Sequence, residues 1–158
     1  KIFKSYFKEY FVLILKTWGK ALVLIMITTI IIQLTTNTTQ ANNQIALQNS
    51  FNSNPVFIAL LAMFYAPIAE ELMFRGVFRK FIKNKKLFVI VSGVVFGLMH
   101  VIDDSKTLAE FSYVFVYSIL GIYLAGIYAK TNNLCTNIFM HFMQNTLSVI
   151  GMILLMFM

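Results

Sequence analysis

Long apolar blocks constrain the fold of this chain more than any other feature. They cover roughly residues 13–34, 55–78, 87–102, 111–129 and 134–158. A helix needs about 20 mostly apolar residues to cross a bilayer, and most of these blocks approach or exceed that length. Only 12% of the residues are charged, about half the usual share in a soluble domain. We therefore expect an all-α fold, a polytopic transmembrane helix bundle of about five spans in which the third is short.

Basic residues are concentrated in alternate loops. They occur around the start of the first block, after the second block and after the fourth: Lys1, Lys4, Lys8, Lys16, Lys20, Arg79, Lys80, Lys83, Lys85, Lys86 and Lys130. Residues 35–54 carry no charge, and residues 103–110 carry three acids and one lysine. Because cytoplasmic loops are enriched in Lys and Arg, this pattern predicts a multi-pass cell-membrane protein with a cytoplasmic N-terminus and an external C-terminus.

The pattern divides the chain into two parts. Residues 1–54 are predicted to hold a basic N-terminal segment, the first span and a linker, and residues 55–158 a four-span unit. The first 14 residues place Lys1, Lys4 and Lys8 on one helical face, which is typical of a helix lying in the membrane interface. An irregular start to the first span, with lysines that reach out to the interface, is the alternative. The uncharged, Asn- and Thr-rich residues 35–54 predict an external linker.

The expected partners follow from the position of these charges. Because the lysines adjoin membrane helices, we expect contact with membrane lipid and no nucleic-acid partner. The abundance of Asn, Ile, Lys and Phe indicates an AT-rich genome and suggests a bacterial source.

A few polar residues lie inside the apolar blocks. They are Glu70, Glu71 and Arg75 in the second, His100 in the third, and His141 and Asn145 in the fifth. Ionisable groups in membrane spans are costly, and they usually face the bundle interior, where they pair or perform a function. Counted from the basic loops, four of these side chains lie at a similar depth of roughly 17–23 Å: Glu70, His100, His141 and Asn145. We therefore expect three helices to bring their polar groups to one level.

Residue spacing separates the two glutamates. Glu71 and Arg75 are four residues apart and share a helical face, so they are expected to form an ion pair. Glu70 is rotated by about 100° from Glu71, and Arg75 is better placed for Glu71. A second carboxylate at this depth indicates a functional role. Taken singly, the ion pair and each histidine also have a purely structural interpretation.

Two further features shape the helices. Pro67 removes a backbone donor just before the acids and can bend the second span. Gly93 and Gly97 form a GxxxG pattern in the third block, and Gly121 with Ala125 forms a weaker version in the fourth. Small residues at this spacing allow two helices to approach closely.

In chain order, the polar residues form three motifs: Glu70-Glu71-x-x-x-Arg75, Phe96-x-x-x-His100 and His141-x-x-x-Asn145. The ordered set resembles the CPBP family of intramembrane proteases. This family includes CAAX prenyl endopeptidases of the Rce type and bacterial bacteriocin-processing and self-immunity proteins. The resemblance covers about residues 55–158 and implies a four-helix catalytic core that cleaves peptide bonds near the cytosolic side of the membrane.

The resemblance also implies a role for each motif residue. Glu70 is expected to be the catalytic carboxylate, with Glu71 and Arg75 as its supporting pair. His100 is expected to hold a water with Glu70, and His141 and Asn145 to stabilise the oxyanion. This assignment suits amide hydrolysis, because a carboxylate in apolar surroundings is a good base for a water proton and an amide and an imidazole can donate to an oxyanion.

The cofactor remains open between two alternatives. Glu70, His100 and His141 could form a two-histidine, one-carboxylate site for zinc or another divalent cation. The family is often described as metalloproteases, yet it also includes members described as glutamate-dependent without a metal. A metal-free glutamate mechanism is slightly favoured.

The expected function is therefore that of an intramembrane endopeptidase acting on a membrane-bound peptide or protein. Its substrate is expected to be a bacteriocin or pheromone precursor, or a CAAX-like C-terminus. The main alternative is a non-catalytic membrane immunity or scaffold protein of the same family. A transporter or proton path using the same acids is less favoured, because the spans are few and no internal repeat is visible.

Overall fold

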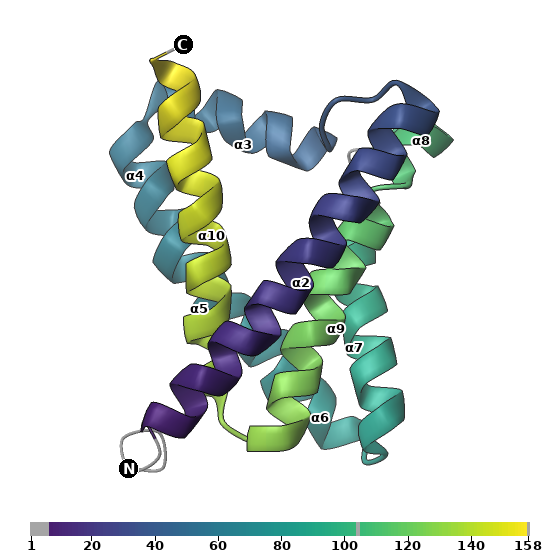
Figure 1. Ribbon diagram of the computed structural model, residues 1–158, viewed down its shortest axis with the longest axis vertical. Coiled ribbons are helices and arrows are strands. Elements are labelled where there is room, and N and C mark those ends of the chain that lie inside the picture. Colours follow the sequence, from purple (N-terminus) through teal and green to yellow (C-terminus); the bar gives the residue numbers. More distant parts are fainter. Residues whose placement is uncertain (1–6, 104, 158) are drawn as a thin grey trace.

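A computed structural model describes residues 7–103 and 105–157 of the chain. Within these residues the fold is helical and contains no strand, which confirms the all-α expectation (Figure 1). Among the described residues, four helices are long and apolar enough to cross a membrane: Lys8–Thr36, Pro55–Phe81, Leu108–Thr131 and Leu134–Met156. Residues 1–6 of the predicted interfacial segment lie outside the described residues.

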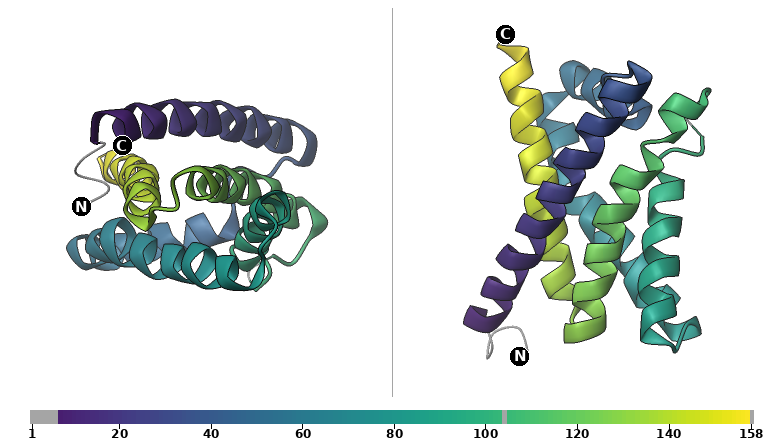
Figure 2. Two further views of the ribbon diagram at one scale, coloured as in Figure 1. Left: turned by 90° about the horizontal axis from the view of Figure 1, so that it is seen from below. Right: turned by 45° about the vertical axis from the view of Figure 1, so that its right-hand side comes forward.

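The first span is α2 (Phe7–Thr36), which crosses the bundle obliquely and packs against α9 and α10 (Figures 1 and 2). The second span is one continuous run of short helical segments. These are α4 (Pro55–Leu60), η1 (Leu61–Tyr65), α5 (Ala66–Glu71), η2 (Leu72–Val77) and α6 (Phe78–Phe81). The two η segments are π-helical, so the register of the helix shifts on both sides of the acidic pair.

The third apolar block forms α7 (Lys85–Met99), which has only 15 residues. Asn84 starts it by accepting hydrogen bonds from the backbone N–H groups of Lys86 and Leu87. The helix ends in a tighter turn, where the His100 N–H bonds to the Gly97 carbonyl at 3.2 Å. With 15 residues, α7 is shorter than the four membrane-length helices found in the described part of the chain. The expectation that the third block is short is therefore confirmed.

Helix α7 packs closely along α9 (Val114–Thr131), which follows the single-turn helix α8 (Leu108–Phe111). A Cβ added at Gly93 would lie 2.7 Å from the Ile122 backbone nitrogen, and one added at Gly97 would lie 2.7 Å from that of Ser118. Gly121 of α9 meets the Gly93 backbone from the other side. The predicted GxxxG contact is therefore confirmed, because the two backbones are too close for side chains between them.

The segment predicted as a linker contains helix α3 (Asn42–Ser53). Its Phe51 is only 2% exposed and packs against Ala62, Val149 and Met152, with Leu47 beside this cluster. Leu47 and Phe51 are four residues apart, so they share one helical face. The linker prediction missed this helix because the polar composition of the segment concealed that pair.

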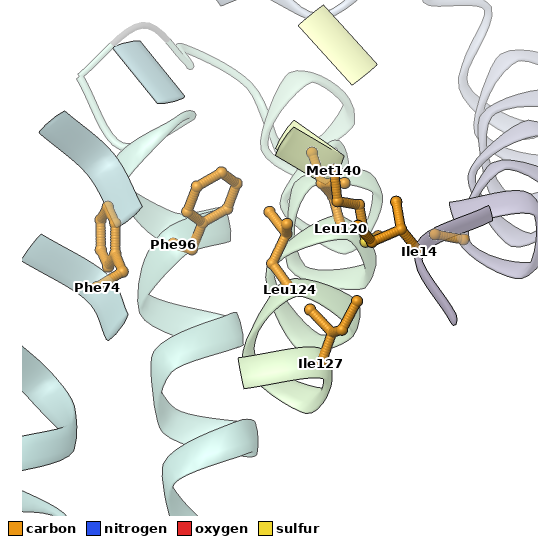
Figure 3. Packing of buried hydrophobic residues seen from close by; sticks show 8 residues of the cluster. Ile14, Phe74, Phe96, Leu120, Leu124, Ile127 and Met140 are labelled. Atoms are coloured by element: carbon orange, nitrogen blue, oxygen red, sulfur yellow. The ribbon is translucent and has the colours of Figure 1, made fainter. Parts of the chain in front are cut away.

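The last span is α10 (Leu134–Met156). The largest core cluster joins it to α2, η2, α7 and α9, as Figure 3 shows. Its members are Ile14, Ala21, Phe74, Phe96, Leu120, Leu124, Ile127 and Met140. This packing holds the three motif-bearing spans in fixed positions relative to one another.

Candidate active site

The second span presents its acids between the two π-helical segments. The Ala66 N–H bonds to the Leu61 carbonyl, five residues earlier. In the same pattern, the Ala62 carbonyl would accept a hydrogen bond from the backbone N–H of residue 67. Residue 67 is a proline, which has no N–H. The Ala62 carbonyl instead accepts a hydrogen bond of 2.7 Å from Nδ2 of Asn145. Asn145 thus replaces the missing backbone donor one turn before Glu70, and π-helical bulges of this kind are frequent at functional sites.

Glu71 is the centre of a buried polar network. Its Oε1 accepts hydrogen bonds from Nη1 of Arg75 at 3.0 Å and from Nδ1 of His141 at 2.9 Å. Arg75 also donates from Nη2 to the Gly121 carbonyl at 2.9 Å. Both Glu71 and Arg75 are fully buried, so the predicted ion pair is confirmed and ties the second span to α9 and α10.

Asn137 belongs to this network although the sequence did not single it out. Its Nδ2 donates to Oε2 of Glu71 at 3.1 Å and to the Leu124 carbonyl at 2.6 Å. The available signal was the spacing of Asn137, His141 and Asn145, which repeats every four residues along one face of α10. All three face the second span, where they contact Glu71 or Ala62.

Glu70 points away from Glu71 and toward the two histidines. Its Oε2 lies 3.8 Å from Nε2 of His100 and 3.9 Å from Nε2 of His141. The expectation that three spans meet at one level is therefore confirmed. Oε2 is buried and has no direct hydrogen-bond partner among the described residues. The two separations are too long for direct hydrogen bonds and suit groups that share a small molecule between them.

The outer contacts of the histidines fix which nitrogen faces Glu70. Nδ1 of His100 lies 2.7 Å from the Phe96 carbonyl, which can only accept, so Nδ1 carries a proton. Nδ1 of His141 likewise donates to the Glu71 carboxylate. The His100 ring lies beside Phe96 and stacks on Tyr117, with centroid distances of 4.4 and 4.7 Å. Both Nε2 atoms are thereby held toward Glu70.

A cavity of about 460 Å³ contains these groups. Glu70, His100, His141 and Asn145 all line it, together with residues from α3, η1, α7 and α9. Glu71 and Arg75 lie behind the wall and do not line the cavity. The arrangement thus separates residues that can touch a substrate from the buried pair that supports them.

The metal alternative can be tested against this geometry. Two imidazoles and one carboxylate are ligands that zinc favours. In a tetrahedral site with ordinary zinc bond lengths, any two ligand atoms lie about 3.4 Å apart. The separations from Glu70 are 3.8 and 3.9 Å. Across the described part of the chain, no three His, Cys, Asp or Glu side chains are arranged to hold a metal ion. The side chains as placed do not fit a metal site, and the mechanism below includes no metal step.

Comparison with known proteins identifies the family. Residues 52–147, more than half of the chain, match the family described as "Type II CAAX prenyl endopeptidase Rce1-like". The chain belongs to this Rce1-like family, and the suspected resemblance is confirmed. The matched region contains all six predicted site residues, from Glu70 to Asn145.

Two curated bacterial proteins are similar to the chain. The "Putative membrane peptidase YdiL" of Bacillus subtilis (strain 168) is 28% identical over 70% of this chain. The "UPF0177 protein YxdF" of Lactococcus lactis subsp. lactis (strain IL1403) is 34% identical over 48% of it. The matches cover only 43% and 38% of these two proteins. No solved structure matches the chain significantly.

Proposed function

We propose that this chain forms an intramembrane endopeptidase that hydrolyses a peptide bond in a membrane-associated polypeptide. The observation that carries the proposal is the convergence of one carboxylate oxygen and two imidazole nitrogens in a cavity within the helix bundle. Family membership and the similarity to the bacterial protein named "Putative membrane peptidase YdiL" support the same class of reaction.

In this mechanism, Glu70 and His100 position the attacking water. One water proton points to Oε2 of Glu70, and the other points to Nε2 of His100, which accepts because Nδ1 holds that ring's proton. Glu70 removes the first proton as the water oxygen attacks the carbonyl carbon of the peptide bond. The carbonyl electron pair moves to its oxygen, which becomes the oxyanion.

His141 and Asn145 are proposed to stabilise that oxyanion. When His141 carries a proton on both ring nitrogens, Nδ1 binds Glu71 and Nε2 donates into the cavity. The positive charges of Arg75 and His141 then balance the negative charges of the two glutamates. Asn145 uses one amide hydrogen for the Ala62 carbonyl and has a second for the substrate.

The tetrahedral intermediate then breaks at its carbon–nitrogen bond. Glu70 transfers the proton taken from the water to the departing amine nitrogen. The second water proton stays with the new carboxyl group, so the reaction consumes one water and returns the enzyme to its initial protonation state. In this proposal Glu70 acts first as a base and then as an acid, and no metal or other cofactor takes part.

The substrate is proposed to be a bacteriocin or pheromone precursor, and a CAAX-like C-terminus is the second choice. The two curated relatives come from bacteria, which favours the peptide precursor. The protein is proposed to lie in a bacterial cell membrane with its N-terminus in the cytoplasm, since its basic residues occur on alternate loops.

The proposal is tested by comparing purified wild-type protein, Glu70→Gln and Glu9→Gln in lipid vesicles that contain a library of membrane-anchored peptides. Glu9 is an exposed glutamate near the start of α2 and serves as the matched control. Mass spectrometry should find the same products with wild type and Glu9→Gln and none with Glu70→Gln. Products that persist with a folded Glu70→Gln protein would contradict the proposed role of Glu70.

A chelator arm of the same experiment tests the metal alternative. Cleavage by wild type should continue after dialysis against 1,10-phenanthroline. If cleavage is lost and then returns when zinc is added, a metal mechanism replaces the one proposed. If Glu70→Gln retains a cellular phenotype such as immunity, the non-catalytic alternative is favoured.

A further inference from the structure

A second cavity lies between the start of α7 and the end of α9. It has a volume of about 550 Å³ and shares no lining residue with the cavity that contains Glu70. Its walls come from residues 85–90 of α7 and residues 126–130 of α9. Figure 1 shows these ends of the two helices beside α6, at the basic end of the bundle. We call this cavity the α7–α9 groove.

The missing side chain of Gly126 opens the groove. A Cβ added at Gly126 would have no atom within 4 Å, whereas one added at Gly121 would lie 2.7 Å from the Gly93 carbonyl oxygen. Helix α9 therefore contacts α7 closely through Gly121 and presents Gly126 to open space. Ile90 on the α7 wall is 57% exposed, so the groove opens on the outer surface of the bundle, where a membrane protein meets lipid.

The body of the groove is apolar. Val89 and Ile90 lie on the α7 wall, and Gly126 and Ala129 lie on the α9 wall. Lipid chains are as apolar as these side chains, so a chain that enters the groove gains van der Waals contact on both walls. The groove therefore has the chemistry of a site for a hydrocarbon chain.

Three lysines stand together at the end of this apolar body. Lys85 and Lys86 begin α7, and Lys130 lies in the last turn of α9. All three are exposed, and within residues 7–103 and 105–157 none of them forms an ion pair. The groove lining contains no aspartate or glutamate. Because these like charges repel one another, an anion that bridges them is bound favourably.

The order of these groups matches that of a phospholipid. Each helix changes from a lysine to an apolar or small residue within one turn, from Lys86 to Ile90 and from Lys130 to Gly126. A lysine ammonium binds phosphate as a point charge, and basic pockets between membrane helices on the cytoplasmic side bind anionic headgroups. The topology proposed above places this end at the cytoplasmic leaflet, whose surface is negative.

We propose that the α7–α9 groove binds one anionic phospholipid, with its headgroup at the three lysines and an acyl chain against Gly126. The bridging headgroup stabilises the pair of helices because it offsets the repulsion between Lys130 and the two lysines of α7. This inference concerns a site separate from Glu70 and does not rest on peptidase activity.

Binding of defined lipids to the purified protein in nonionic detergent tests the ligand class. Native mass spectrometry measures the Kd of dioleoyl phosphatidylglycerol, of dioleoyl phosphatidylcholine, which has the same chains, and of sn-glycerol 3-phosphate, which has no chain. One phosphatidylglycerol should bind at least about tenfold more tightly than either of the others, as expected for three lysines beside an anionic lipid. Equal binding of the two phospholipids would overturn the headgroup role, and equal binding of glycerol phosphate would overturn the lipid.

A pair of variants with the same net charge tests the position of the headgroup. Combining Lys85→Gln, Lys86→Gln and Lys130→Gln should weaken phosphatidylglycerol binding about tenfold or more. The control replaces three exposed lysines of α2 with glutamine: Lys8, Lys16 and Lys20. It should leave the Kd unchanged. Equal losses in the two variants would show general charge attraction and would overturn the site.

A pair of glycine variants tests the position of the acyl chain. Gly126→Leu fills the groove without changing its charge and should weaken binding about tenfold, as expected when roughly 50–60 Å² of apolar contact is lost. Gly151→Leu in α10 is the control, because a Cβ there also meets no atom within 4 Å. Both should stay folded, since leucine favours a helix. An unchanged Kd for Gly126→Leu would overturn the groove assignment. A dimer in the same spectra that only Gly126→Leu dissociates, with lipid binding unaffected, would replace the lipid with a second copy of the chain.

Discussion

Nδ2 of Asn145 donates a hydrogen bond of 2.7 Å to the carbonyl oxygen of Ala62, five residues before Pro67. The π-helical register at this point would require a donor from Pro67, which has none. Asn145 therefore has a structural contact as well as a place in the cavity wall. This dual position means that loss of activity on substitution of Asn145 cannot by itself identify an oxyanion donor.

A double-mutant cycle between Asn145 and Pro67 separates the two roles. Asn145→Ala leaves the buried Ala62 carbonyl without a partner and should destabilise the protein by about 1–3 kcal/mol. Pro67→Ala restores a backbone N–H, so Asn145→Ala should cost less stability in that background. Unfolding in mixed micelles measures both values. Equal costs in the two backgrounds would show that the carbonyl is not the shared target.

Activity provides the second reading of this cycle. If Asn145 also donates to the oxyanion, the Pro67→Ala, Asn145→Ala protein should recover stability but not kcat. Recovery of both quantities would assign Asn145 a purely structural role.

Arg75→Ala should destabilise the folded protein strongly. It removes the cation beside Glu71 and the donor to the Gly121 carbonyl, and it leaves a buried negative charge. Breaking a buried ion pair from one side costs about 3–5 kcal/mol. Lys80→Ala, an exposed residue one turn further along, is the control and should have little effect. Equal melting of wild type and Arg75→Ala would contradict this prediction.

Gly97→Ala should impair both folding and cleavage. An added Cβ would lie 2.7 Å from the Ser118 nitrogen and 2.8 Å from the Val114 carbonyl, so α7 would have to move away from α9. His100 follows Gly97 by only three residues, and its distance from Glu70 should increase.

Gly126→Ala is the matched control, because no atom lies within 4 Å of a Cβ added there. It should be neutral or stabilise the protein by roughly 0.5–1 kcal/mol. Thermal unfolding and cleavage of the two variants measure the difference. A Gly97→Ala protein as stable and active as Gly126→Ala would show that close α7–α9 contact is not required.

Much of the fold could be predicted from the sequence because bilayer thickness and apolar length are directly related. The boundaries of the second and fifth blocks agree closely with the structure. Helix α3 could not be predicted in the same way. Its position depends on Phe51 packing into a cluster formed with distant residues of η1 and α10, and such contacts leave only a weak local pattern.

The candidate site shows a similar division. Residue spacing predicted the Glu71–Arg75 pair, and similar depth predicted the meeting of Glu70, His100 and His141. Neither principle could show that Nδ1 of His141 binds Glu71 or that Asn137 joins the network. These contacts depend on how α10 is rotated against the second span, which is fixed by tertiary packing.

The central claim is that Glu70 acts on a water molecule and not on the substrate itself. It is tested most directly by a single turnover in water enriched in oxygen-18, with enzyme in excess over a cleaved peptide. The account predicts that the new carboxyl group carries one oxygen-18 atom from the first turnover. An unlabelled product in the first turnover, with the label found later on Glu70, would show covalent attack by the carboxylate and would contradict the mechanism.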